Sequence, residues 1–325
     1  MIKWGIVGLG NMANIFASSI KDIGNAKLLG ISSKNNKRLE NFQKKFDIQR
    51  KYTFNNYEDL IKCDEIDAVY ISTLNNTHLD LIKECAENNK NILCEKPISL
   101  NFDEAKLAKK FIEKNKIMFF EAIAYRTHPQ TKILNDLINQ NEIGEIISIN
   151  LSFGFKVNKI NPQSRLFNKK LGGGAILDVG CYPVSLLTLV SKSKIFNLIK
   201  SNGSFIQTDV DNFANASILV DKKIDSEIEV SFKQDLDNKV VFKGENGSIV
   251  VNNPWLPDIK NHIDINIGNK FYKKFINCEK SLYANQIQEI SNNFENIIDN
   301  DNYSVNINES NMIMKILTDW ADSIK

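Results

Sequence analysis

The segment IKWGIVGLGNMANIFASSI, residues 2–20, decides the predicted fold. It begins with an apolar run, Ile2 to Val7, of the kind found in buried strands, and it continues from Met12 to Ile20 with apolar residues at helical spacing. The glycine-rich stretch GLGNMA, residues 8–13, joins the two without any intervening loop. The segment therefore predicts a strand, a tight turn and a helix in direct succession.

A GxGxxA turn between a strand and a helix is typical of dinucleotide-binding units. Gly8 permits the tight turn, Gly10 lets the backbone approach a pyrophosphate, and Ala13 leaves room for close helix packing. The free amide groups at the start of the helix attract the diphosphate. The alternative is an ordinary glycine-rich turn. On the dinucleotide interpretation, the residues expected to contact the cofactor are Gly8, Leu9, Gly10, Asn11 and Met12.

The end of the second predicted strand, Lys27 to Ser32, indicates which cofactor is preferred. Enzymes that use NAD usually place a carboxylate here to bind the ribose 2′-hydroxyl, but this chain has no Asp or Glu between Asp22 and Glu40. Instead Ser33, Lys34 and Arg38 offer a hydroxyl and two positive charges to a 2′-phosphate. The alternative is that both cations are solvated residues at a helix start. The pattern favours NADP over NAD.

The chain divides into two regions of different pattern. Up to residue 122, short apolar runs alternate with helical periodicity, which predicts a doubly wound parallel sheet. From about residue 145, mostly alternating runs follow one another, which predicts a large, mostly antiparallel open sheet with helices on one face. Two helices, near 283–298 and 309–324, close the chain. The predicted fold is α/β, with a Rossmann domain over residues 1–122 and an α+β domain over residues 123–325.

The composition excludes several classes of protein. The formal net charge is +2, from 41 basic and 39 acidic residues with no basic block, so neither nucleic acid nor a membrane surface is indicated as partner. No run of eighteen apolar residues exists, and we expect a cytoplasmic protein. Five cysteines without CxxC spacing and three scattered histidines predict no disulfide scaffold and no metal site.

Four motifs together resemble the Gfo/Idh/MocA (glucose-fructose oxidoreductase / inositol dehydrogenase) family: GLGNMA at 8–13, TLNNTH at 73–78, EKP at 95–97 and LGGGAILDVGCYP at 171–183. Their order and spacing span nearly the whole chain, which makes the match more specific than any one motif. EAIAYRTHPQ at 121–130, combined with the last motif, looks most similar to the dimeric dihydrodiol dehydrogenases and the NADP-dependent D-xylose dehydrogenases.

The resemblance implies three catalytic residues. An alcohol that loses a hydride must also lose its hydroxyl proton, and a lysine with a lowered pKa can accept it. The family implies this part for Lys96, with a cis bond before Pro97. Pro183 is tolerated only in a first helical turn, which indicates a helix that starts near Asp178 and presents Asp178 and Tyr182 on one face. We assign Tyr182 the acid/base or oxygen-stabilising role and Asp178 a substrate-orienting role.

The resemblance also implies further contacts. Thr73, Asn75 and His78 line the nicotinamide ribose in the family, although Leu74 replaces the usual proline and His78 could simply begin a helix. Tyr125 corresponds to a segment near the nicotinamide and is a candidate substrate contact. The remaining candidates are Glu95 and Arg126 for the cofactor and Arg165 for the substrate, where Arg126 could equally be an ion-pair partner and Arg165 a surface charge.

The expected activity is NADP-dependent hydride transfer between nicotinamide C4 and a carbinol or carbonyl carbon of a small sugar-like or trans-diol substrate. Two alternatives stay open: an inositol, sugar-nucleotide or imine reductase on the same fold, and a catalytically silent NADP-binding sensor. The family further implies a homodimer or homotetramer that assembles through the sheet of the C-terminal domain.

Overall fold

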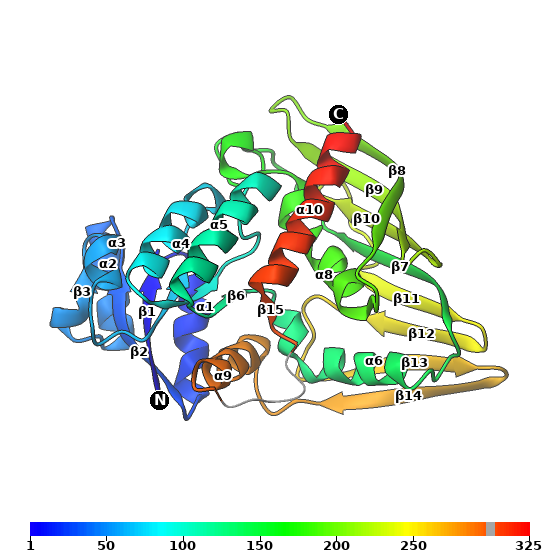
Figure 1. The fold of residues 1–325 in the computed structure, drawn as a ribbon, viewed down its shortest axis with the longest axis horizontal. Helices are drawn as coiled ribbons and strands as arrows, with labels where there is room; N and C mark the ends of the chain where they lie inside the picture. Colours follow the sequence, from blue (N-terminus) through cyan, green and yellow to red (C-terminus); the bar gives the residue numbers. More distant parts are fainter. Residues whose placement is uncertain (297–302) are drawn as a thin grey trace. The chain divides into compact units, whose positions relative to one another are not determined.

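The computed structural model describes residues 1–296 and 303–325 of the chain (Figure 1). These residues form two compact units. The first comprises Met1–Ser99, Asp103–Thr127 and Lys280–Asn311, and the second comprises Leu100–Phe102, His128–Glu279 and Met312–Lys325. Each unit is built around its own sheet, so each is described by itself.

The sheet of the first unit has seven strands in the order β15-β6-β5-β4-β1-β2-β3. Strands β1 to β6 run parallel, and only β15 pairs in the antiparallel sense, with β6. The order reverses between β1 and β4, and at such a reversal a doubly wound sheet binds its ligand beyond the carboxyl ends of the strands. The strands are β1 (Ile2–Val7), β2 (Ala26–Ser32), β3 (Thr53–Phe54), β4 (Ala68–Ile71), β5 (Asn91–Cys94), β6 (Phe119–Glu121) and β15 (Val305–Asn306).

Helices connect these strands in sequence, as the alternating pattern predicts. They are α1 (Asn11–Ser19), α2 (Asn36–Phe46), α3 (Tyr57–Ile61), α4 (His78–Glu87) and α5 (Phe102–Asn115). A sixth helix, α9 (Leu282–Phe294), comes from the far end of the chain and packs on α1. Residues 297 and 298 of the helix expected near 283–298 lie outside the described residues.

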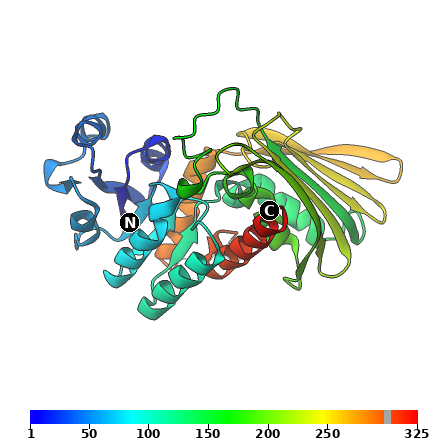
Figure 2. The ribbon, with the colours of Figure 1, turned by 90° about the horizontal axis from the view of Figure 1, so that it is seen from above.

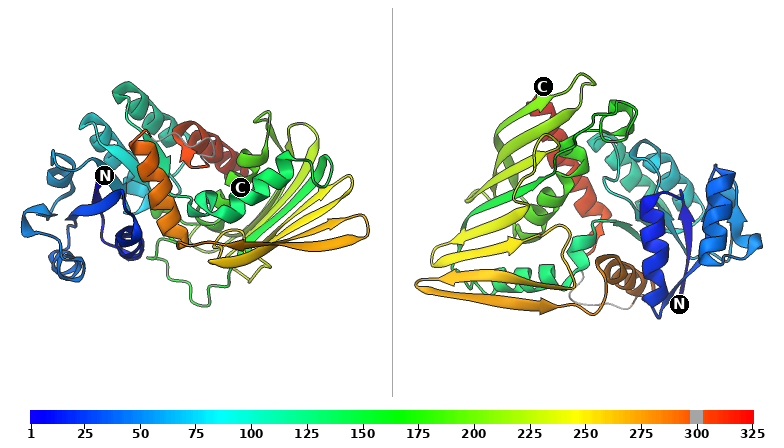
Figure 3. Two further views of the ribbon diagram at one scale, coloured as in Figure 1. Left: turned by 90° about the horizontal axis from the view of Figure 1, so that it is seen from below. Right: turned by 180° about the vertical axis from the view of Figure 1, so that it is seen from behind.

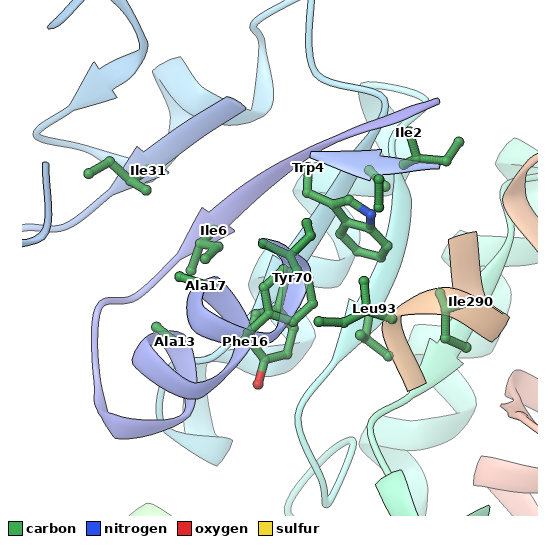
Figure 4. Close-up of a cluster of buried hydrophobic side chains, with 14 of the residues drawn as sticks. Ile2, Trp4, Ile6, Ala13, Phe16, Ala17, Ile31, Tyr70, Leu93 and Ile290 are labelled. Carbon is green, nitrogen blue, oxygen red and sulfur yellow. The ribbon is translucent and has the colours of Figure 1, made fainter. Parts of the chain in front are cut away.

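The core of the first unit explains why α9 belongs to it. The Trp4 ring lies 5.3 Å from the Phe16 ring and 5.5 Å from the Phe294 ring, and Trp4 Nε1 donates to Ser291 Oγ at 3.1 Å. In Figure 4 the Trp4, Phe16 and Tyr70 side chains lie in one cluster with Ile290 of α9. Each such buried side chain contributes roughly 1.5–3 kcal/mol of stability.

The two units differ from the expected domains 1–122 and 123–325. The first unit continues to Thr127, and it regains Lys280–Asn311 after the second sheet is complete. The cause is the apolar face of α9, which fills the core beside β1 and α1 instead of packing with its neighbours in sequence.

The sheet of the second unit has eight strands in the order β14-β13-β12-β11-β7-β10-β9-β8. All neighbours are antiparallel except β7 and β10. This confirms the predicted α/β fold with a second, mostly antiparallel sheet. The strands are β7 (Ile146–Gly154), β8 (Phe196–Phe205), β9 (Asp211–Val220), β10 (Ile224–Ser231), β11 (Lys239–Gly244), β12 (Gly247–Asn252), β13 (Lys260–Ile267) and β14 (Lys270–Asn277).

Helices of the second unit lie on one face of this sheet (Figures 2 and 3). They are α6 (Pro129–Asn139), α7 (Ala175–Asp178), α8 (Cys181–Val190) and the C-terminal part of α10 (Ile307–Ser323). Residues on the strands alternate accordingly, as in β10, where Ile224, Ser226 and Ile228 are buried while Asp225 and Glu227 are exposed.

Three further features concern the described residues alone. None of their helices has by itself the length and apolar composition of a membrane span. No group of three or more His, Cys, Asp or Glu residues is arranged to hold a metal ion in that part of the chain. All five cysteines are free thiols.

Candidate functional site

The turn after β1 has the geometry that a dinucleotide diphosphate requires. Gly8 has φ +88°, a conformation that favours glycine, and a Cβ there would lie 2.7 Å from Thr73 Cγ2. Gly10 is the N-cap of α1, and a Cβ added to it would meet no atom within 4 Å. The first turn of α1 carries no acidic residue and no side-chain cap. The helix start therefore presents amide groups and a positive dipole end to an anion.

The segment after β2 brings two cations to one tyrosine. The Lys34 ammonium lies 5.1 Å from the Tyr57 ring centroid. Burial raises the pKa of Tyr57, and the charge of Arg38 opposes this shift. The Ser33 hydroxyl accepts a hydrogen bond from the Asn35 amide at 3.2 Å, and Asn35 caps α2. The expected phosphate contacts Ser33, Lys34 and Arg38 thus border the N-terminal ends of α2 and α3, and the first turn of α2 carries no carboxylate.

The loop after β4 joins the cofactor turn to the EKP motif. Ser72 Oγ donates to the Gly8 carbonyl at 2.7 Å, and the Thr73 and Thr77 hydroxyls lie 2.7 Å apart. His78 Nδ1 lies 3.0 Å from the Pro97 carbonyl oxygen, and its Nε2 lies 3.4 Å from the Thr73 carbonyl oxygen.

His78 is thus held by two backbone carbonyl groups, and its expected contact with the nicotinamide ribose stays a prediction. Its side chain is fully buried, and burial lowers its pKa to about 4, so the imidazole is neutral. A neutral imidazole has one N–H, and the shorter contact makes Nδ1 the donor to Pro97. The expected contact Asn75 is also largely buried, in the short helical turn before α4.

Lys96 follows β5 at the carboxyl edge of the parallel sheet. The Lys96–Pro97 peptide bond is cis, as the resemblance implies. The Glu95 carboxylate accepts a hydrogen bond from the buried Tyr70 hydroxyl at 2.5 Å. On the other side of Lys96, the Ile98 amide donates to Glu121 Oε1 at 2.9 Å. Both neighbours of the Lys96–Pro97 pair are thus anchored to the sheet below them.

Tyr125 and Arg126 lie in the interior of the first unit, only 1% and 2% exposed. The Arg126 guanidinium makes a bidentate ion pair with Glu309, with N–O distances of 2.8 and 3.2 Å. The ion-pair interpretation considered at the outset is thus confirmed, while a contact of Arg126 with the cofactor stays a prediction. Arg126 holds the start of α10 to the segment after β6.

The second unit carries the DVGCYP motif on two helices. We expected one helix starting near Asp178, but α7 ends at Asp178 and α8 begins at Cys181, with the flanking segments bent by 51°. A continuous helix would place Pro183 in its interior, where the ring would clash with the Val179 carbonyl and a hydrogen bond would be lost. Because α8 begins at Cys181, Pro183 stands in its first turn, as predicted.

Asp178 and Arg165, both expected near the substrate, contact each other. Arg165 Nη1 donates to Asp178 Oδ1 at 2.5 Å, and the Asp178 side chain is 6% exposed against 50% for Arg165. The Tyr182 ring stands edge-on to the Phe153 ring, with centroids 5.1 Å apart and an interplanar angle of 88°, and Trp255 lies beyond. These aromatic contacts fix the tyrosine ring against the sheet.

Two acidic residues with structural importance were missed at the sequence level. Glu121 entered the sequence analysis only as the first residue of EAIAYRTHPQ, although a carboxylate directly after two phenylalanines is itself a signal. Asp211 accepts a hydrogen bond from the Ile176 amide at 2.8 Å and so caps α7. Burial raises the pKa of Asp211 to about 6. No spacing in the sequence connects Asp211 with α7, because β9 lies far along the chain.

The expected site residues thus fall into two groups. The cofactor candidates and Lys96 belong to the first unit, whereas Asp178, Tyr182 and Arg165 belong to the second. The approach of Tyr182 to Lys96 over a nicotinamide ring stays a prediction.

Comparisons with known proteins agree with this organisation. Residues 2–122 match the family model described as "Oxidoreductase family, NAD-binding Rossmann fold", and residues 131–250 match the model of the GFO/IDH/MocA C-terminal domain. Among curated proteins, trans-1,2-dihydrobenzene-1,2-diol dehydrogenase of Xenopus tropicalis is 28% identical over 78% of this chain and 77% of its own length. D-xylose 1-dehydrogenase (NADP(+)) 2 of Haloferax volcanii is 34% identical over 42% of this chain and 41% of its own.

Solved structures share the fold over the whole chain. A 3-ketoreductase from Actinomadura kijaniata, in complex with NADP and TDP-benzene, has a TM-score of 0.88 at 19% identity and covers 100% of this chain and 98% of its own. An aldose-aldose oxidoreductase from Caulobacter crescentus, complexed with glycerol, has a TM-score of 0.90 at 15% identity, covering 99% and 97%. At these identities the likeness concerns the fold.

Proposed function

The chain belongs to the Gfo/Idh/MocA family of NAD-binding oxidoreductases, and from this premise we propose that it is an NADP-dependent dehydrogenase of sugar-like or trans-diol substrates. The hydride passes between nicotinamide C4 and a carbinol or carbonyl carbon. The observation that carries the proposal is the placement of Lys96 in the anchored turn after β5, in the same unit as the open glycine turn after β1. Two relatives that the chain resembles are named for a trans-diol and for D-xylose with NADP.

The preference for NADP rests on charge. A 2′-phosphate carries negative charge that a carboxylate at the end of β2 would repel. Ser33 can donate its hydroxyl proton to the phosphate, and the cations Lys34 and Arg38 border the same position. The residues present therefore fit the phosphorylated nucleotide better than the unphosphorylated one.

Residues of this chain transfer the proton that accompanies the hydride. When bound, NADP supplies the carbon that releases or accepts the hydride. Lys96 then takes the hydroxyl proton during oxidation, or returns it to the carbonyl oxygen during reduction. The Tyr182 hydroxyl stabilises the same oxygen. Asp178, held by Arg165, accepts a hydrogen bond from a neighbouring hydroxyl and so selects substrates with adjacent oxygens.

We assign self-association to the second sheet. Among the described residues, the helices of that unit lie on one face only, and the other face carries an acidic strand and a basic strand on either side of β7. Asp225, Glu227 and Glu229 of β10 project there, as do Lys239 and Lys243 of β11. A second copy related by a two-fold axis can set each strand against its opposite in charge.

The test is a coupled absorbance screen of the purified chain against aldoses, trans-diols, inositols and α-dicarbonyls, with NADP and NAD in parallel. We expect turnover with an aldose or a trans-diol, and with NADP in preference to NAD. Turnover confined to inositols, or to NAD, would contradict the substrate class or the cofactor. Stoichiometric NADPH binding without turnover on any compound would favour the sensor alternative.

Lys96→Ala tests the residue that carries the proposal. We expect NADPH affinity within about threefold of the unaltered protein and turnover reduced by about 10²–10⁴-fold, the range of general acid–base contributions. Lys106→Ala is the matched control, because this exposed lysine on α5 forms a surface ion pair with Asp103. Unchanged turnover in Lys96→Ala would remove the lysine from the chemistry.

A further inference from the structure

Glu121 occupies a position from which it controls the backbone beside Lys96. It ends β6, its side chain is 2% exposed, and its Oε1 accepts the hydrogen bond of the Ile98 amide at 2.9 Å. Pro97 has no N–H, so the Ile98 amide is the first backbone donor after Lys96. The hydrogen bond to Glu121 therefore anchors the first N–H after the lysine, in the same peptide group whose carbonyl oxygen contacts His78.

The same carboxylate interacts electrostatically with Lys96. Burial raises the pKa of Glu121 to about 7, and the charges around it act in both directions: Glu309 raises this pKa, whereas Lys96 lowers it. The nearby Ser310 hydroxyl also lowers the pKa of Glu121. Glu121 Oε2 and Ser310 Oγ are nevertheless not in hydrogen-bond geometry. Because an electrostatic interaction is mutual, a cation that favours the carboxylate is itself favoured by it.

Other titratable groups lie around the pair, among them the neutral imidazole of His78, which contacts the Pro97 carbonyl oxygen. Glu95 precedes Lys96 and is engaged by Tyr70. Burial raises the pKa of Tyr283 on α9; the charge of Glu95 raises this pKa further, and the charge of Lys96 lowers it. Cys94, at the end of β5, is fully buried, and the negative charge of Glu121 contributes to raising its pKa. Of these groups, Glu121 alone both binds the turn through its backbone and bears a charge that favours protonated Lys96.

On the basis of the proposed function, we infer that Glu121 is a positioning residue for Lys96: it fixes the turn through the Ile98 amide, and its carboxylate stabilises the lysine ammonium. The two effects are separable by substitution. Glutamine keeps the size and the carbonyl acceptor but removes the charge. Leucine removes both.

The charge predicts a change in pH dependence. In Glu121→Gln the Lys96 ammonium loses its stabilising neighbour, so the amine becomes a free base at lower pH. We expect the acidic limb of the pH profile for substrate oxidation to move down by about one pH unit, with KM for NADP unchanged. In Glu121→Leu we expect turnover to fall at least about tenfold below that of Glu121→Gln, because the lysine is no longer held.

A direct titration of Lys96 tests the inference without a substrate. Competitive labelling with acetic anhydride over a range of pH, followed by peptide mass spectrometry, measures the proton affinity of each lysine amine. We expect the Lys96 curve of Glu121→Gln to move to lower pH by about one unit, while the Lys106 curve stays in place. Glu113→Gln, an exposed charge removal on α5, is the matched control and leaves the Lys96 curve unchanged.

The outcomes separate this inference from the proposed function. If Lys96→Ala turns over normally, the proposed function fails, whereas a shifted labelling curve still supports the electrostatic link. If Lys96→Ala is inactive and Glu121→Gln leaves the labelling curve in place, the inference alone is overturned. Equal turnover in Glu121→Gln and Glu121→Leu, with both variants folded by circular dichroism, would contradict the anchoring role.

Discussion

At the level of single residues, the proposed preference for NADP depends on the charge at one strand end. Ser33 is almost fully buried at the end of β2, where its hydroxyl already accepts a hydrogen bond from Asn35. Its neighbours Lys34 and Arg38 supply charge from the segment that follows. The end of β2 can therefore accommodate a 2′-phosphate as long as no carboxylate lies beside it.

Ser33→Asp reverses this balance. The new carboxylate repels the 2′-phosphate and can accept hydrogen bonds from the ribose hydroxyls of NAD. We expect the ratio of the Kd for NADPH to the Kd for NADH to rise by at least about tenfold, measured by fluorescence titration with both nucleotides. Ser18→Asp, at the exposed end of α1, is the matched control. An unaltered ratio in Ser33→Asp would contradict the assignment.

His78 makes the stability of the first unit depend on pH. Its pKa is lowered from 6.5 to about 4 by burial, so the unfolded chain binds the proton more readily than the folded one. The stabilisation is complete above pH 6.5 and is lost as the pH falls through 4, by about 3 kcal/mol in total. Glu121 and Asp211 change in the opposite sense, since their pKa values are raised by burial.

Comparison of His78→Asn with the unaltered chain isolates this contribution, because the two carboxyl groups are common to both proteins. We expect the loss of unfolding free energy between pH 7 and pH 4.5 to be smaller in His78→Asn by about 2 kcal/mol, measured by urea denaturation. His262→Asn, a partly exposed imidazole on β13, serves as control. The same pH dependence in His78→Asn and the unaltered chain would show that His78 is not buried neutral.

Among the elements, α9 shows how a helix distant in sequence completes a core. Its Ala284, Ile287, Ile290 and Phe294 are buried with residues of β1 and α1.

We expect Phe294→Ala to lower the free energy of unfolding by about 3–5 kcal/mol, the range for a truncated core phenylalanine, as measured by denaturant titration. Phe275→Ala is the control: its ring is 75% exposed on β14, and a change within about 0.5 kcal/mol is expected. Equal effects of the two substitutions would contradict the packing of α9.

The elements also show what the sequence could predict. β1, α1 and β2 follow from their apolar patterns and from the GLGNMA turn, and the structure has them within a residue or two. Strand β14 was not predicted, because seven of its eight residues are exposed at a sheet edge and give no apolar alternation. Strand β8 was not predicted for a similar reason: it contains Lys200, Asn202 and Gly203, and its residues are all exposed or only partly buried.

The sequence predicted less of the candidate site than of the fold. Motifs indicated Lys96, Asp178 and Tyr182, and Pro183 correctly marked a first turn. The start of α7 is capped by Asp211, which comes from another strand, and such a partner has no sequence spacing. The same holds for Glu121 and Ile98, which meet only because β5 and β6 are neighbours in the sheet.

At the scale of the whole molecule, the uncovered sheet face of the second unit predicts how copies of the chain associate. Its central strands carry Glu227, Asn150 and Val241 side by side in register. This face is polar, with acidic residues on one strand and basic residues on another. Such an arrangement favours pairing with a surface of complementary charge over nonspecific aggregation. The proposed two-fold assembly sets β10 of one copy against β11 of the other.

Val241→Asp tests that assembly, because it adds an anion at the centre of the basic strand. We expect the sedimentation coefficient at micromolar concentration to fall from that of an oligomer to that of a monomer, with the far-ultraviolet circular dichroism unchanged. Leu107→Asp, on an exposed position of α5, is the control and keeps the oligomer. Since charge pairing weakens with salt, the unaltered chain is also expected to dissociate more readily at 1 M than at 0.1 M salt. An oligomer that persists in Val241→Asp would place the interface on another surface, whereas a monomer in both proteins would exclude self-association altogether.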